Sequence, residues 1–241
     1  MKLESTESQK SIPVNKRIIF ALDVESPDEA RGWVEKLKDR VKFYKVGLQL
    51  FLAGGFKIID WIVEQDLEVM VDLKFFDVPQ TVASAVGQLK GHGISFTTVH
   101  GNDAILKAAV EAKHDVKILA VTVLTSLDQA DLKDLGFQCP VEDLVFSRAR
   151  RALDLGCDGV VSSGLEVSRL RNGLGRNFLV IVPGVRPVQN REEDDQKRII
   201  TIKDAFQSGA DYVVVGRPIR QAKDPSLMVE EMQIQIEEVF A

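Results

Sequence analysis

Three charged residues stand close together in the segment VMVDLKFFDVPQTV, which spans residues 69–82. Asp72, Lys74 and Asp77 follow directly on a short apolar stretch. In an extended strand alternate side chains share a face, so Asp72 and Lys74 point the same way with their Cα atoms about 6.5 Å apart. An ammonium group beside a carboxylate is suited to stabilise developing negative charge and then to deliver a proton. The segment therefore predicts a site for electrostatic or acid–base chemistry at the end of a buried strand.

Two further charged residues belong to neighbouring apolar runs. Lys45 lies within KFYKVGL (42–48), and Asp23 ends RIIFALD (17–23). Buried charges must be paired, and alternating carboxylates and ammonium groups would pair one another. A single Asp–Lys pair is most simply a structural ion pair. Four or five charges on three adjacent strands favour a catalytic site instead, because desolvating so many charges rarely stabilises a fold.

Eight short apolar runs alternate with amphipathic stretches from residue 17 onward. Continuous Val- and Ile-rich runs separated by helices are typical of a parallel sheet covered by helices. Eight such units in about 225 residues match an α/β protein with a single-domain (β/α)8 TIM barrel. A doubly wound open sheet is the alternative, but no glycine-rich phosphate turn follows the first run. The runs are 17–23, 42–48, 68–74, 94–100, 116–124, 158–163, 178–184 and 211–216.

The barrel is expected to span residues 17–241, with residues 1–16 as a flexible or loosely docked tail. The first 16 residues lack the apolar core of a signal peptide.

Near the end of the sequence, PGVR (183–186) and VGR (215–217) close the seventh and eighth runs. Barrels often bind phosphate at these loops, where glycine N–H groups approach the anion and arginine holds it with a planar fork. A phosphate site is therefore predicted there.

Composition excludes several classes of protein. The chain has 241 residues, 45% of them hydrophobic, which is enough for a sizeable core. A net charge of −5 argues against broad nucleic-acid binding, and no apolar run approaches the roughly 18 residues of a membrane span. Cys139 and Cys157 have neither disulfide nor zinc-site spacing, so reduced thiols in a cytoplasmic protein are expected. No metal or redox cofactor is implied.

A lysine in such a barrel acts either as a Schiff-base nucleophile or as a charged acid. The first role needs a neutral amine, whereas nearby carboxylates favour the charged form. Carboxylates outnumber amines around Lys74, which favours an ammonium group that stabilises a carbanion and then protonates it. The residues alone therefore predict an enzyme acting on a small phosphorylated substrate.

The segment DLKFFDVPQT (72–81) resembles the DxKxxDIPxT signature of the bacterial-type orotidine 5′-phosphate decarboxylase family, with Val78 replacing the commoner Ile. The resemblance covers nearly the whole chain from about residue 17, and the combined motifs are more specific than DxKxxD alone. It implies cofactor-independent decarboxylation of orotidine 5′-phosphate to UMP, the last step of de novo pyrimidine biosynthesis. The other family motifs occur in order as ALD (21–23), YKVG (44–47), VTVLTS (121–126), PGVR (183–186), DDQ (194–196) and VVGRP (214–218).

The resemblance also implies a role for each matching residue. Lys74 would protonate C6 of the pyrimidine, and Asp72 would lie near the departing carboxylate. Lys45 and Asp77 would complete the charged network, with Asp77 and Thr81 supplied by the neighbouring subunit of a homodimer. Further substrate contacts implied are Asp23 and Lys45 at the ribose, Thr125 at the pyrimidine, Arg186, Gln196, Gly216 and Arg217 at the phosphate, and Pro183 beside them.

Two rival functions stay open at this point. Metal-dependent 3-keto-gulonate-phosphate decarboxylases and hexulose-phosphate synthases share the DxKxxD motif. In that branch an acidic residue that helps to hold magnesium stands where this chain has Lys45. The other rival is a phosphate-binding regulator without turnover, and the complete set of lysines and aspartates argues against it.

Overall fold

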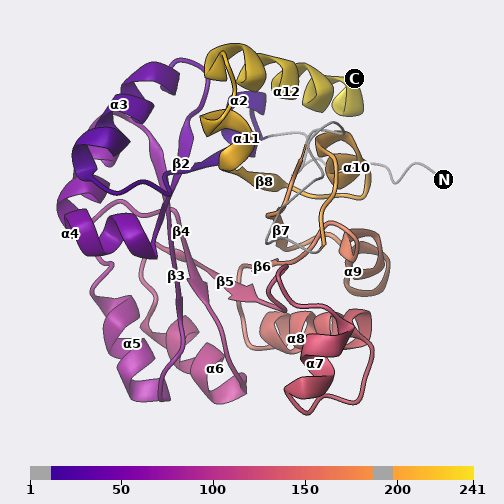
Figure 1. Cartoon of the computed structure of the whole chain (residues 1–241). Coiled ribbons are helices and arrows are strands. Elements are labelled where there is room, and N and C mark those ends of the chain that lie inside the picture. Colours follow the sequence, from indigo (N-terminus) through magenta and orange to yellow (C-terminus); the bar gives the residue numbers. More distant parts are fainter. Residues whose placement is uncertain (1–11, 187–197) are drawn as a thin grey trace.

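The strands form one closed parallel barrel in which each strand pairs with the next and the eighth pairs with the first. This computed structural model describes residues 12–186 and 198–241 (Figure 1). The (β/α)8 barrel predicted from the eight apolar runs is confirmed. The strands are β1 (Ile18–Ala21), β2 (Phe43–Gly47), β3 (Glu68–Phe75), β4 (Phe96–Val99), β5 (Lys117–Val121), β6 (Gly159–Val161), β7 (Leu179–Val182) and β8 (Tyr212–Val215).

Helices surround the barrel, with α3 and α4 on the opposite side from α9 and α10 (Figure 1). Several begin at caps that the sequence encodes locally: the Ser26 side chain accepts the amide of Glu29 at the start of α3, and Asp224 caps α12. The helices are α2 (Val14–Arg17), α3 (Pro27–Leu37), α4 (Leu48–Val63), α5 (Pro79–Gly87), α6 (Asp103–Ala112), α7 (Gln129–Asp134), α8 (Val141–Asp154), α9 (Val167–Leu174), α10 (Ile202–Gln207), α11 (Arg217–Arg220) and α12 (Pro225–Phe240).

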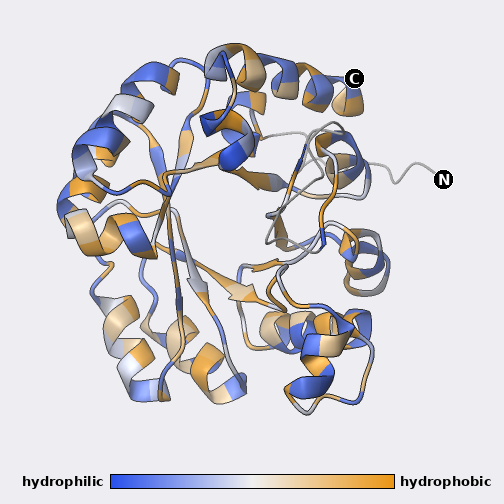
Figure 2. Cartoon of the chain, in the orientation of Figure 1, coloured by the Kyte–Doolittle hydropathy of each residue, from blue (hydrophilic) through white to orange (hydrophobic). Residues whose placement is uncertain are grey.

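Strand side chains divide between two apolar layers because they alternate in direction. Outward residues such as Phe20 and Val71 pack beneath the helices, whose apolar faces turn toward the strands (Figure 2). Inward residues fill the barrel, where the ring of Phe43 lies 4.9 Å from Phe96 and 5.7 Å from Tyr212. This aromatic layer closes the barrel interior below the carboxyl ends of the strands, so the space for a ligand lies above it.

The amino-terminal boundary differs in detail from the expected one. Arg17, expected to open the first strand, ends the short helix α2. Its guanidinium lies 3.9 Å from the ring centroid of Phe240, and Lys16 pairs with Glu68 at 2.6 Å. Residues 1–11 of the expected tail lie outside the described residues, and the division of the chain after residue 16 stays a prediction.

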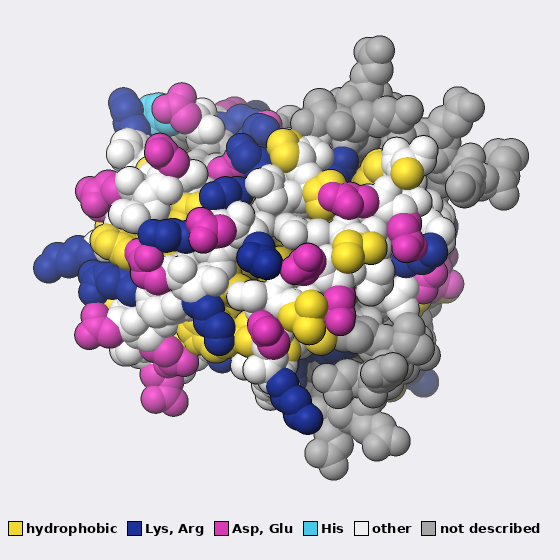
Figure 3. All heavy atoms as spheres, turned by 90° about the horizontal axis from the view of Figure 1, so that it is seen from above, with side chains coloured by type: hydrophobic (Ala, Val, Ile, Leu, Met, Phe, Trp, Pro, Cys, Tyr) yellow, Lys and Arg dark blue, Asp and Glu magenta, His cyan; other side chains and the backbone are white. Residues whose placement is uncertain are grey.

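The surface carries both signs of charge. Figure 3 shows basic and acidic side chains interspersed over the face that it presents. Among the described residues, no helix is long and apolar enough to cross a membrane.

Candidate active site

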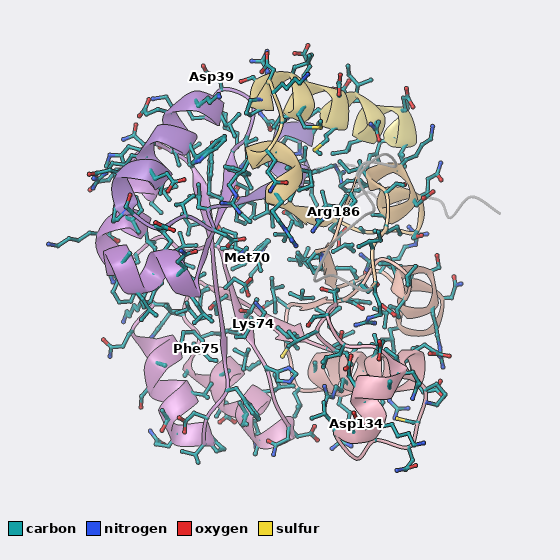
Figure 4. The ribbon with its side chains drawn as sticks, in the orientation of Figure 1. Asp39, Met70, Lys74, Phe75, Asp134 and Arg186 are labelled. Atoms are coloured by element: carbon teal, nitrogen blue, oxygen red, sulfur yellow. The ribbon has the colours of Figure 1, made fainter. Side chains whose placement is uncertain are left out.

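A cavity of about 550 Å³ opens at the carboxyl ends of the strands, above the aromatic layer. Sequence reasoning placed the site at this end of the barrel, since that is where barrel enzymes build their sites. In Figure 4, Met70, Lys74 and Arg186 lie toward the middle of the barrel, whereas Asp39 and Asp134 lie at its periphery. The predicted residues that line the cavity are Asp23, Lys45, Asp72, Lys74, Thr125, Pro183, Arg186, Gly216 and Arg217.

Four charged side chains form an alternating chain along one wall: Asp23 just after β1, Lys45 in β2, and Asp72 and Lys74 in β3. The Nζ atom of Lys45 lies 3.0 Å from Oδ1 of Asp23 and 3.4 Å from Oδ2 of Asp72. The other oxygen of Asp72 lies 2.8 Å from Nζ of Lys74. Each buried charge therefore has a partner of opposite sign, as the spacing predicted.

The network keeps its most buried members charged at neutral pH. Burial by itself would lower the pKa of Lys45, but attraction from Asp72 and Asp23 outweighs it and raises this pKa above its ordinary value. Burial would likewise raise the pKa of Asp72, but Lys45 and Lys74 outweigh it and lower this pKa. A carboxylate and an ammonium ion thus lie beside each other, with 3.4 Å between Oδ2 of Asp72 and Nζ of Lys45.

Two arginines line the same cavity from the segments that follow β7 and β8. Arg186 is 8% exposed and follows Gly184, whose φ of +73° turns the chain after β7. Its backbone amide donates to the carbonyl of Ile200 at 3.0 Å. Arg217 begins α11 directly after Gly216, where an added Cβ would lie 3.2 Å from Ala21. The predicted phosphate site therefore combines two arginine side chains with a glycine, Gly216, whose backbone has no side chain to keep a ligand away.

Comparison with known proteins decides the family. Residues 16–232 match the family described as Orotidine 5′-phosphate decarboxylase / HUMPS family. The chain belongs to this family. An orotidine 5′-phosphate decarboxylase of Methylococcus capsulatus is 59% identical over 235 residues, which cover 97% of each chain. One of Xanthomonas euvesicatoria pv. vesicatoria is 45% identical over 93% of each chain.

A solved structure supports the same assignment. The crystal structure of orotidine 5′-phosphate decarboxylase from Lactobacillus acidophilus superposes with a TM-score of 0.81 at 34% identity, covering 92% of this chain and 99% of that one. The resemblance read from the DLKFFDVPQT segment and its companion motifs is therefore confirmed at the level of the orotidine 5′-phosphate decarboxylase / HUMPS family.

Two residues of the family signature, Asp77 and Thr81, do not line the cavity in this single chain. Asp77 and Thr81 are exposed beyond the end of β3, and Asp77 accepts the amide of Val78 at 2.6 Å. Phe76 and Val78, on either side of Asp77, are 67% and 63% exposed. Gln196 lies outside the described residues, so its phosphate contact stays a prediction.

Sequence reasoning missed several residues that shape the site. Gly47 lies two residues after Lys45, and a Cβ there would meet Nζ of Lys45 at 3.0 Å. Thr98, on the inward face of β4, donates to Asp72, and Arg220 donates to the carbonyl of Asp23 at 2.6 Å. The alternation of side chains along β2 and β4 was the available signal for Gly47 and Thr98, since both share the inward face of their strand.

Arg198 is another missed residue, and it supports the segment that carries Thr125. Its amide donates to the carbonyl of Thr125 at 3.3 Å, and its guanidinium donates to the carbonyls of Val123 and Leu124 at 3.0 Å each. The same guanidinium pairs with Glu166 at 2.7 Å. Burial raises the pKa of Glu166 despite this pairing. The contacts of Arg198 span residues far apart in sequence, which no local pattern reveals.

His100 is a hydrogen-bonded residue in the wall of a neighbouring cavity. Its Nδ1 lies 3.0 Å from the carbonyl of Val121, so this nitrogen carries the proton. It lines a second cavity of about 410 Å³ next to the first. In residues 12–186 and 198–241, no three or more His, Cys, Asp or Glu side chains are placed to hold a metal ion.

Proposed function

We propose that this chain decarboxylates orotidine 5′-phosphate to UMP, the last step of de novo pyrimidine biosynthesis. The bond between C6 of the pyrimidine and its carboxylate breaks, CO2 leaves, and the electron pair stays on C6 until a proton joins it. The observation that carries the proposal is the Asp23–Lys45–Asp72–Lys74 chain on one wall of a cavity that Arg186 and Arg217 also line. The relatives named for this activity support it.

Lys74 is the proposed acid. Its ammonium group is held 2.8 Å from Asp72, and 37% of the side chain is exposed in the open cavity. A fixed ammonium group stabilises negative charge that develops at C6, because its dipoles and charge need no reorganisation during the reaction. It then transfers a proton to C6 and regains one from solvent through the exposed side of the group.

Asp72 and Lys45 hold this ammonium group in place. Asp72 stays ionised beside Lys74 because two amines surround its carboxylate, and the departing carboxylate of the substrate would lie near it. Lys45, with 9% of its side chain exposed, joins Asp72 to Asp23. Asp23 is 47% exposed toward the cavity, so Asp23 and Lys45 are placed to meet ribose hydroxyls.

The other walls of the cavity are proposed to bind the phosphate and the pyrimidine of the substrate. Arg186 and Arg217 provide planar donors, Gly216 lets its backbone approach the anion, and Pro183 lines the cavity beside them. Thr125, which is 7% exposed, is proposed to bind the pyrimidine. Binding energy from the phosphate, remote from C6, is available to assemble the site around the reacting group.

A homodimer is proposed to complete the site. Asp77 and Thr81 stand outside the cavity of their own chain, and exposed Phe76 and Val78 flank Asp77. An exposed apolar pair around a signature aspartate is suited to contact a second copy, which would then receive Asp77 and Thr81.

A cytoplasmic location is proposed from the two free cysteines, Cys139 and Cys157.

A spectrophotometric assay of orotidine 5′-phosphate consumption tests the proposal. Purified chain is expected to convert the nucleotide to UMP at the same rate before and after exhaustive chelation of metals. Loss of activity on chelation, restored by magnesium, would point to the metal-dependent branch of the family. Binding of UMP without any consumption of orotidine 5′-phosphate would point to a non-catalytic regulator.

A further inference from the structure

Strands β3 and β4 lose their regular pairing at the active site. Val71 pairs with Thr97, but the next pair joins Phe75 to Val99. Three residues of β3, from Asp72 to Lys74, therefore lie opposite the single residue Thr98. Such an irregularity bends a strand and redirects its side chains. Lys74 has a φ of +49°, in the left-handed region that is uncommon for a residue with a side chain.

The hydroxyl of Thr98 occupies the place of the missing strand pairing. The amide of Lys74 donates to Oγ1 of Thr98 at 2.9 Å. Oγ1 of Thr98 in turn donates its proton to Oδ1 of Asp72, also at 2.9 Å. The same Oδ1 accepts from Nζ of Lys74 at 2.8 Å. The backbone amide and the side-chain ammonium group of Lys74 are thus joined into one ring through Thr98 and Asp72.

We propose that Thr98 is a positioning residue for the reaction, whose hydroxyl holds the backbone of Lys74 and the carboxylate of Asp72 in their active arrangement. The inference rests on the proposed function of Lys74 and Asp72. Thr98 has no exposed surface, so it acts through these two residues and does not need to touch the substrate. A hydroxyl is needed because the position must accept one hydrogen bond and donate another at the same oxygen.

The neighbouring Thr97 provides a matched control. It is on the same strand, is equally buried, and its hydroxyl also makes a hydrogen bond, to the carbonyl of Val71 at 3.0 Å. Its side chain takes no part in the ring. Thr97→Val and Thr98→Val each replace one buried hydroxyl with a methyl group of similar size, so their general effects on folding are comparable.

The experiment compares Thr98→Val, Thr98→Ser and Thr97→Val for kcat and KM with orotidine 5′-phosphate, and for hydrogen exchange of the Lys74 amide by NMR. Thr98→Val is expected to lower kcat about 10- to 100-fold with little change in KM, since small misplacements of reacting groups cost this much. The Lys74 amide should exchange faster in Thr98→Val because it has lost its acceptor. Thr98→Ser keeps the hydroxyl and should restore both properties, and Thr97→Val should leave both unchanged.

Equal losses of kcat in Thr98→Val and Thr97→Val would overturn the inference, as would unchanged exchange of the Lys74 amide in Thr98→Val. If Thr98→Val does not fold, Thr98→Ala replaces it in the comparison with Thr98→Ser. Failure of the proposed function is a separate result, since the unchanged chain would then not consume orotidine 5′-phosphate. The amide exchange still tests the ring in that case, because it needs no turnover.

Discussion

Asp72 and Lys74 form an ion pair of 2.8 Å within a single strand, yet their exposure differs: 12% of the Asp72 side chain is exposed and 37% of the Lys74 side chain. The carboxylate is enclosed, while the ammonium group reaches into the cavity. This difference suits a fixed anion that holds a cation able to meet substrate and exchange protons with solvent.

Lys74→Ala is expected to lower turnover of orotidine 5′-phosphate by at least about 1000-fold, because it removes the proposed proton donor and the positive charge proposed to lie beside C6. Affinity for UMP, measured by calorimetry, should be retained, since Arg186 and Arg217, the proposed phosphate ligands, are unchanged. Lys107→Ala, on the exposed face of α6, is the control and should leave turnover unchanged. Substantial residual turnover in Lys74→Ala would remove Lys74 from the proton transfer.

Arg217→Ala is expected to weaken binding of the phosphorylated substrate about 10- to 100-fold, the usual loss for a hydrogen bond to a charged group. Affinity for the bare nucleoside orotidine should change little, because it has no phosphate for Arg217 to hold. Arg169→Ala, which removes an exposed arginine paired with Asp143, is the control. Equal losses for nucleotide and nucleoside would place Arg217 outside the phosphate site.

Asp77→Ala and Lys74→Ala together test the proposed homodimer. Each variant alone should be nearly inactive. A hybrid dimer, co-expressed with two affinity tags, should regain about half of the wild-type activity, because one of its two symmetric sites receives both intact residues. The control is a hybrid of wild type and Lys74→Ala. An inactive hybrid of Asp77→Ala and Lys74→Ala would show that Asp77 does not contribute to the active site of the other subunit.

Lys45→Met should change how stability depends on pH. In the wild type the lowered pKa of Asp72 stabilises the fold above its unfolded pKa of about 3.9, and this contribution is lost as pH falls through the lower native value. Without Lys45, only Lys74 and the Thr98 hydroxyl oppose the effect of burial, so the native pKa of Asp72 is expected to rise. The variant should then lose about 3 kcal/mol of unfolding free energy at pH 7 and less at pH 4.5.

Urea unfolding of Lys45→Met, wild type and the surface control Lys107→Met at both pH values measures this effect. The deficit of Lys45→Met relative to wild type must shrink toward acid pH. A deficit of equal size at pH 7 and pH 4.5 would mean that lost packing, rather than the unpaired carboxylate of Asp72, causes the destabilisation.

Arg198→Met is expected to destabilise the fold by about 3 kcal/mol, because it leaves Glu166 buried without its partner. The double variant Glu166→Met/Arg198→Met should recover part of this loss, since it buries no charge. Urea unfolding at pH 7 gives both values. A double variant that is less stable than Arg198→Met would show that the contacts of Arg198 with the carbonyls of Val123 and Leu124 matter more than the ion pair.

Much of the site could be predicted because its signals are local. The polar ends of the apolar runs placed Asp23, Lys45, Asp72 and Lys74 at one rim, and strand alternation put Asp72 and Lys74 on one face. Arg17 shows the limit of local patterns. It belongs to an apolar run, yet it ends α2, and its guanidinium lies 3.9 Å from the ring centroid of Phe240 at the far end of the chain.

By itself, the sequence determined the eight-stranded barrel, the end of the barrel that carries the candidate site, and the charged residues in that site. These depend on apolar periodicity and on the alternation of side chains along a strand, which nearby residues set. Tertiary structure alone decided the irregular pairing of β3 with β4 from Asp72 to Lys74, the ring through Thr98 and the support of Thr125 by Arg198. These features depend on how two strands pair and on contacts between residues distant in the chain. Such contacts are set by the closed barrel as a whole, and no single segment encodes them.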